Sequence, residues 1–248
     1  PGEDVCAWVS GFFGSGKSHF LKVLGYLLED RPLTWPGGTV VSSREFLCQK
    51  LGLGSMAPIL AREFDTRVLY INLVNREPRE TVSHLVYQTL LESKGLSTQL
   101  WVAQWEEEFQ SLGKWEAFLD WVKARWGRPW EQERRLNAYP VLLRALVELI
   151  PDKYRDENLS RTALDDSRHR FAEVRPGDVA LRLRREAESI HPTRGRIVVL
   201  IDEVGLYIGD SPDRVGDVRA LAEQVVAQGQ GKVWLVASAQ ETLEDLVT

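Results

Sequence analysis

Four short runs of apolar residues stand out along the chain, and each reads as a buried β-strand. They cover residues 5–10, 68–74, 197–201 and 233–238. Continuous apolar runs of this length are typical of strands buried on both faces, as in a parallel sheet. After the first and second runs, apolar residues recur every three or four positions, the spacing of a helix with one apolar face. Strands that alternate with such helices predict an α/β protein with a parallel sheet and helices on both faces.

A long stretch between the second and third runs has a different pattern. Strand-like runs are absent from residues 98–192 and helical periodicity dominates, which predicts a large α-helical insertion. We therefore expect a first part of the core at 1–97 and a second part at 193–248. Six of the nine tryptophans lie in the insertion. We interpret them as its core rather than a base-stacking surface, since three glutamates at 106–108 lie among them.

Composition and charge narrow the function further. No apolar run reaches the roughly 20 residues that cross a bilayer, so we expect no membrane contact. Cys6 and Cys48 are the only cysteines, too few for a disulfide framework, which favours a cytoplasmic protein with reduced thiols. The net charge of −5 would repel nucleic acid. The arginine-rich stretch 161–196 is interpreted as a solvated helix face, with a weak DNA or partner contact as the alternative, and we expect any DNA contact to be indirect.

A glycine-rich turn after the first run carries the most specific motif. Residues 11–18 fit G-x-x-x-x-G-K-[ST] between a strand and a helix, the context of a phosphate-binding loop. Backbone N–H groups of such a loop cradle phosphate oxygens, and the start of the helix adds positive potential. The Lys17 ammonium would reach the β- and γ-phosphates of ATP, and the Ser18 hydroxyl would bind Mg²⁺. The candidate ATP-binding residues are Gly11, Phe12, Phe13, Gly14, Ser15, Gly16, Lys17, Ser18 and His19.

Two acids end the third run. Asp202 at this position can hold Mg²⁺ through water, and Glu203 is placed to orient or deprotonate an attacking water. Gln240 ends the fourth run and is a candidate to position that water against the γ-phosphate, with Ser238 as its competitor. The candidate catalytic residues are therefore Glu203, Lys17 and Gln240, and the candidate metal-binding residues are Ser18 and Asp202.

Other nucleotide-binding classes fit these motifs less well. Residues 202–205 also fit the D-x-x-G of GTPases, but no N-K-x-D motif occurs in the chain. The L-S-G-G-Q signature of transporter ATPases is absent, and small-molecule kinases usually lack the acidic pair. The pattern favours an ATPase. Its rival is a nucleotide-gated scaffold that binds ATP, hydrolyses it negligibly and recruits partner proteins.

The residues around the motifs are more specific than the motifs themselves. Residues 8–22, 202–210 and 231–241 resemble the P-loop ATPase of BREX phage-defence systems, the BrxC/PglY family. The resemblance implies an AAA+-like P-loop NTPase of the ASCE type in which ATP hydrolysis drives conformational change or assembly. It also implies other BREX defence components as partners, including a methyltransferase, and carries Lys17, Ser18, Asp202, Glu203 and Gln240 into their roles. We expect self-association, and we expect the chain to be a piece of a longer protein, truncated before a fifth strand and a lid.

Overall fold

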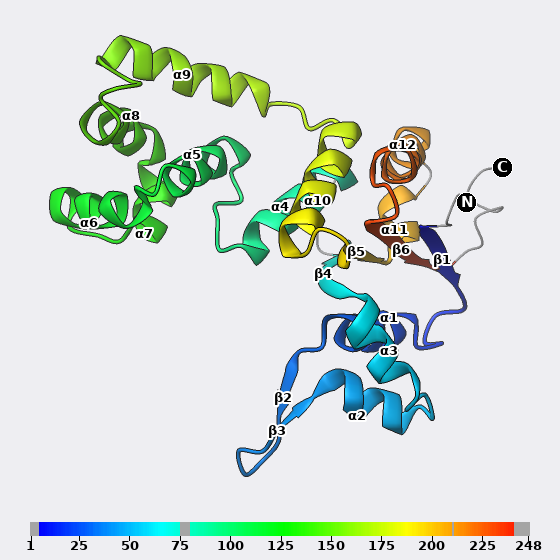
Figure 1. Ribbon diagram of the computed structural model, residues 1–248. Helices are drawn as coiled ribbons and strands as arrows, with labels where there is room; N and C mark the ends of the chain where they lie inside the picture. Colours follow the sequence, from blue (N-terminus) through cyan, green and yellow to red (C-terminus); the bar gives the residue numbers. More distant parts are fainter. Residues whose placement is uncertain (1–4, 75–79, 210, 241–248) are drawn as a thin grey trace. The chain divides into compact units, whose positions relative to one another are not determined.

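A four-stranded parallel sheet forms the framework of one part of the molecule (Figure 1). The computed structural model describes residues 5–74, 80–209 and 211–240. The strand order is β1-β6-β5-β4, and each neighbouring pair is parallel. The strands are β1 (Cys6–Ser10), β4 (Asp65–Asn72), β5 (Gly195–Asp202) and β6 (Val233–Ala239). The α/β class and the parallel sheet that the four apolar runs predicted are confirmed.

The chain divides into two compact units, which we describe separately. The sheet unit comprises Pro1–Thr89 and Arg175–Thr248, and the helical unit comprises Leu90–Val174. Helix α4 (Val82–Ser93) contains the first boundary between them. Among the described residues, no helix combines the length and the apolar character needed to span a membrane.

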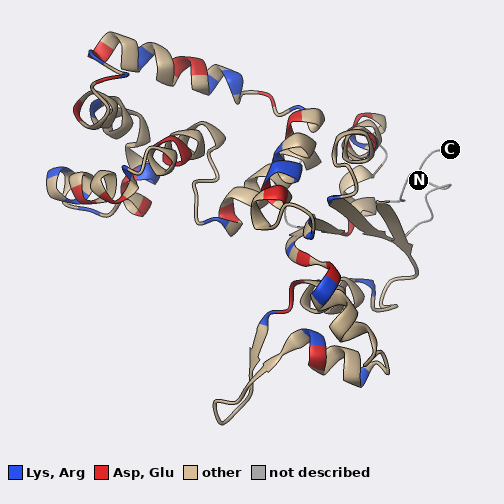
Figure 2. Ribbon diagram, viewed as in Figure 1, with Lys and Arg blue, Asp and Glu red and all other residues tan. Residues whose placement is uncertain are grey.

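Helices cover both faces of the sheet (Figure 1). Helix α1 lies on one face, and its Leu21 packs with Val68 and Leu200 of the sheet in a buried cluster. Helices α10 and α12 pack against each other on the opposite face. Strands β1 and β6 carry no charged residue (Figure 2). Strand β6 is largely buried, whereas β1, at the end of the strand order, has no buried residue, so the expectation of a buried strand is wrong for β1. The helices of this part are α1 (Lys17–Glu29), α10 (Pro176–Ile190), α11 (Val204–Ile208) and α12 (Pro212–Gln228).

A small lobe follows α1 in the chain. Strands β2 (Pro32–Thr34) and β3 (Val40–Ser42) form an antiparallel hairpin, and helices α2 (Ser43–Lys50) and α3 (Met56–Glu63) lead into β4. Arg44 attaches this lobe to α1, because its guanidinium donates to carbonyl oxygens at the end of that helix.

The helical unit, which the structure describes in full, contains helices and loops but no strand. Trp130 and Phe118 are fully buried at its centre, and their rings meet edge to face. The six tryptophans of residues 98–192 either belong to this core or pack against it. Such packing accounts for their number without a nucleic-acid surface. The helices are α5 (Leu100–Ser111), α6 (Trp115–Trp126), α7 (Trp130–Leu136), α8 (Ala138–Leu149) and α9 (Glu157–Arg170).

The units divide at different residues from the boundaries 98 and 192 expected above. Helix α10 lies within 98–192, yet it packs on β5 and belongs to the sheet unit. Its Glu186 accepts a hydrogen bond at 2.6 Å from Arg67 of β4. Helical periodicity shows that α10 has an apolar face but cannot show that a sheet covers it. Acids and arginines both occur along α9 and α10 (Figure 2), and each helix carries an ion pair between residues four apart, Arg161 with Glu157 and Arg184 with Glu188, as on a solvated helix face.

Candidate functional site

The sheet brings the predicted site residues to one edge. Parallel strands have their carboxyl ends on the same side, and β6 lies between β1 and β5. Ser10 at the end of β1 pairs with Ala239, and Ile201 before Asp202 pairs with Ala237. Neighbouring strands are about 4.8 Å apart, so the loop after β1 begins about 10 Å from Asp202, the last residue of β5. This separation suits a group of phosphate size between them.

Glycines allow the loop after β1 to turn tightly. Gly14 and Gly16 have φ angles of 79° and 92°, which residues with a side chain adopt only at a cost. A Cβ on Gly11 would lie 2.9 Å from the Ser15 hydroxyl oxygen. The Ser15 amide donates to the Phe12 carbonyl at 3.1 Å and closes the turn. The loop therefore leads directly into α1, whose first turn receives no side-chain cap and whose N–H groups remain available to an anion.

Lys17 is buried in this loop rather than extended into solvent. Lys17 is 7% exposed. Its ammonium donates to the carbonyl oxygens of Gly11 at 2.6 Å and Phe12 at 3.1 Å. These partners are neutral, so among the residues that the structure describes the positive charge has no hydrogen-bonded counter-ion. Phe12, Phe13 and His19 lie at the surface instead, with Phe12 and Phe13 88% and 85% exposed.

Asp202 is fully buried at the end of β5, and its carboxylate accepts hydrogen bonds from both neighbouring strands. The Ser238 hydroxyl donates to Oδ1 at 2.6 Å, and the Tyr70 hydroxyl donates to Oδ2 at 2.7 Å. Burial raises the pKa of the Asp202 carboxyl, but hydrogen bonds from Ser238, Tyr70 and Ser18, with the nearby charge of Lys22, hold that pKa below its ordinary value. The Ser18 hydroxyl, in the first turn of α1, therefore lies near Asp202, whose carboxyl is ionised at neutral pH.

Glu203 and Gln240 meet at the rim of the same edge. Glu203 has a φ of 62°, in the left-handed region that a non-glycine residue seldom occupies, and its amide donates to the Ser238 hydroxyl at 3.2 Å. The Gln240 amide nitrogen lies 3.5 Å from a Glu203 carboxylate oxygen, and Gln240 is exposed. The two polar candidates at the end of β6 therefore donate to different carboxylates: Ser238 to that of Asp202, and Gln240 to that of Glu203.

The oxygen donors of Ser18 and Asp202 fit a magnesium ion that arrives with a nucleotide. Mg²⁺ prefers hard oxygen ligands and is usually held by one or two protein groups together with phosphate oxygens and water. Among the described residues, no group of three or more His, Cys, Asp or Glu could hold a metal ion without such help. Ser18 and Asp202 are therefore too few to hold a structural metal ion alone, but they suffice for a magnesium ion that is also bound by nucleotide phosphates.

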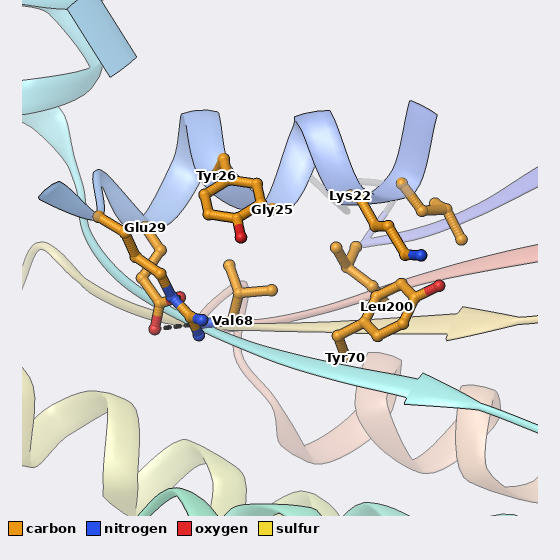
Figure 3. Close-up of a pocket in the computed structure, with 9 residues that line it drawn as sticks. Lys22, Gly25, Tyr26, Glu29, Val68, Tyr70 and Leu200 are labelled. Atoms are coloured by element: carbon orange, nitrogen blue, oxygen red, sulfur yellow. Dashed lines mark hydrogen bonds and ion pairs between the residues drawn. The ribbon is translucent and has the colours of Figure 1, made fainter. Parts of the chain in front are cut away.

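The sequence did not single out Tyr70, whose hydroxyl donates a hydrogen bond to the Asp202 carboxylate in the structure. Tyr70 lies in β4, in register with Leu200 of β5, and its ring stands below α1 opposite Lys22 (Figure 3). Burial and hydrogen bonding to the neighbouring Asp202 carboxylate raise the pKa of the Tyr70 phenol, which therefore keeps its proton and remains a donor. The available signal was a tyrosine within the apolar segment 68–71 of β4, the strand that pairs with β5 and its terminal Asp202.

Comparisons with known proteins add no family to these findings. No protein-family model matches the chain, and a search of the solved structures finds no match. The functional interpretation therefore depends on the residues and their geometry.

Proposed function

We propose that the sheet unit is a P-loop NTPase core that binds and hydrolyses ATP with Mg²⁺. One observation carries the proposal: the Ser18 hydroxyl at the start of α1 lies near enough to Asp202 at the end of β5 to help lower the pKa of its carboxyl, and both lie beside the glycine-rich loop. A hydroxyl that follows a loop lysine and a carboxylate at a strand end are the two protein groups that a nucleotide-bound magnesium ion requires.

In the proposed mechanism, each residue has a separate task. Loop N–H groups and Lys17 bind the phosphates, and Ser18 and Asp202 hold Mg²⁺, which neutralises charge on the phosphate oxygens when bound. The Glu203 carboxylate accepts a proton from water as the water oxygen bonds to the γ-phosphorus. The bond from that phosphorus to the β,γ-bridging oxygen breaks, giving ADP and phosphate. Gln240, next to Glu203, orients the same water.

Three blocks of sequence support a place for this activity in phage defence. Residues 8–22, 202–210 and 231–241 resemble the BREX ATPase family, and the first two contain the loop and the acidic pair. We infer on that basis that ATP hydrolysis drives conformational change or assembly in a BREX-type complex. The proposed partners are other copies of this chain and other defence components, including a methyltransferase.

The open geometry around Glu203 favours a second candidate, a nucleotide-gated scaffold with negligible hydrolysis. The contact between Glu203 and Gln240 is long, at 3.5 Å, and Gln240 is exposed. A base that shares its water with solvent is a poor catalyst, because bulk water competes for the same hydrogen bonds. Binding without turnover would follow.

Calorimetry and phosphate release on the same sample separate these candidates. The enzyme proposal expects Mg-ATP to bind and phosphate to be released faster than in a Glu203→Gln sample. The scaffold expects equal binding with phosphate release at the level of that variant. Absence of any heat with Mg-ATP and Mg-GTP would contradict both.

A further inference from the structure

The Asp202 carboxylate is held between donors from the strands on either side of its own. Tyr70 of β4 donates to one oxygen at 2.7 Å, and Ser238 of β6 donates to the other at 2.6 Å. The sequence already indicated one of these donors, since Ser238 was a candidate site residue at the end of β6. The hydrogen bond from Tyr70 comes from β4, at one end of the described strand order, and none of the predicted motifs includes this residue.

Two donors on opposite oxygens fix a carboxylate that would otherwise turn. The torsion about the Cβ–Cγ bond of an aspartate is broad and has no sharp staggered minimum. Each carboxylate oxygen offers about two lone-pair directions, so one donor on each leaves the other direction available. Tyr70 and Ser238 therefore set the plane of the carboxylate without blocking it.

Tyr70 is itself held in place from two directions. Its ring lines a pocket with Val68 and Leu200, and Lys22 of α1 approaches the ring face with its ammonium 5.9 Å from the ring centroid (Figure 3). Cation and ring at this distance attract each other. Because α1 follows the glycine-rich loop directly, the same helix carries Ser18 and the lysine that contacts the Tyr70 ring.

We propose that Tyr70 is a positioning residue of the magnesium site, acting through Asp202; this inference rests on the function proposed above. Its phenol fixes the plane of the carboxylate so that the remaining lone pairs face Ser18 and the water shell of Mg²⁺. Outer hydrogen-bond partners of metal-binding groups contribute about 10- to 100-fold to metal affinity in other proteins. Tyr70 occupies that place here.

Mn²⁺ binding, followed by electron paramagnetic resonance in the presence of ATP, tests this role without a measurement of turnover. Tyr70→Phe keeps the ring and removes the hydroxyl. We expect ATP affinity in EDTA to stay within about twofold of the parent, while Mn²⁺ affinity of the ATP complex falls about 10-fold. Tyr26→Phe is the matched control. Tyr26 lines the same pocket from α1, but it is not one of the residues whose hydrogen bonds lower the pKa of Asp202. It should leave both affinities unchanged.

A double-mutant cycle separates positioning from a general structural effect. In an Asp202→Asn background, Tyr70→Phe should cause no further loss of Mn²⁺ affinity, because its effect passes through the carboxylate. Equal Mn²⁺ affinity in Tyr70→Phe and the parent would overturn the inference and leave the ATPase proposal intact. A parent that binds no ATP would overturn the ATPase proposal first. Weakened ATP binding in EDTA, or a loss that persists in the Asp202→Asn background, would show that Tyr70 is only structural.

Discussion

Buried charges are treated differently in the helical unit and at the candidate site of the sheet unit. Glu106 in the helical unit is fully buried and accepts hydrogen bonds from the Ser97 amide at 2.6 Å and the Trp130 indole at 2.6 Å. Its third partner is a cation, since Arg134 donates to it at 2.8 Å. Asp202 in the sheet unit is equally buried, yet its hydrogen-bond donors are neutral hydroxyl groups.

The cations of the two regions show the same contrast. Arg134 is bonded to an acid, whereas Lys17 is bonded to the carbonyl oxygens of Gly11 and Phe12. A buried charge that is neutralised internally is costly to unpair and has little left to offer a ligand. A buried charge held by neutral groups keeps its field, so Lys17 is suited to an anion and Asp202 to a cation. Glu106 and Asp202 are equally buried, so it is the type of partner that differs between them: an arginine for Glu106 and hydroxyl groups for Asp202.

The largest expected effect is on stability, in the helical unit. Glu106→Gln leaves Arg134 with a neutral partner. It also places the NH₂ group of the new amide among groups that can only donate, the Ser97 amide and the Trp130 indole. Breaking a buried pair costs about 3–5 kcal/mol. Urea unfolding followed by tryptophan fluorescence should report this loss. Glu157→Gln is the control, because its ion pair with Arg161 is exposed and contributes about 0.5 kcal/mol or less. Equal midpoints for the two variants would contradict the structural role of Glu106.

The next expected effect is on nucleotide binding. Lys17→Ala removes the charge that the loop holds without a counter-ion, so ATP binding should fall below detection by calorimetry. The fold should survive, because the lysine is bonded to backbone carbonyls of its own loop and to no other element. Lys50→Ala in α2 is the control and should bind ATP like the parent. Micromolar ATP affinity in Lys17→Ala would remove the loop from the proposed site.

Glu203→Gln should slow ATP hydrolysis by about 10²-fold, the size of a lost general base. The amide can still contact Gln240 and hold a water molecule, but it cannot take the proton. ATP affinity should therefore stay the same, and phosphate release should fall. Glu223→Gln serves as control, because Glu223 is exposed on α12 and pairs with Arg219. If Glu203→Gln hydrolysed ATP at the parental rate, another group would have to accept the proton of the attacking water.

Sequence patterns predicted the features that depend on local order and missed those that depend on register. The four strands and the loop at residues 11–18 follow from apolar runs and from glycine positions, which act over a few residues. The contact between Ser18 and Asp202 follows from parallel topology, which the alternation of strands and helices already indicates. Tyr70 was missed because its role depends on β4 being the neighbour of β5, and strand order is a long-range property. The placement of α10 was missed for the same reason, since periodicity does not name the partner of an apolar face.

The smallest expected effect is a change in stability from Asp202→Asn, and it is the sharpest test of the comparison. The hydroxyl groups of Ser238, Tyr70 and Ser18 can each turn and accept a hydrogen bond as well as donate one. They can therefore adapt to an amide, which the donors around Glu106 cannot do. We expect Asp202→Asn to cost about 1 kcal/mol, the size of one neutral hydrogen bond, and so to melt nearer to the parent than Glu106→Gln does. The same variant should lose the Mg²⁺ dependence of ATP binding, because the negative charge of the carboxylate is gone. A stability loss as large as that of Glu106→Gln would mean that Asp202 belongs to the same structural class as Glu106, and that its neutral partners do not mark it as a cation site.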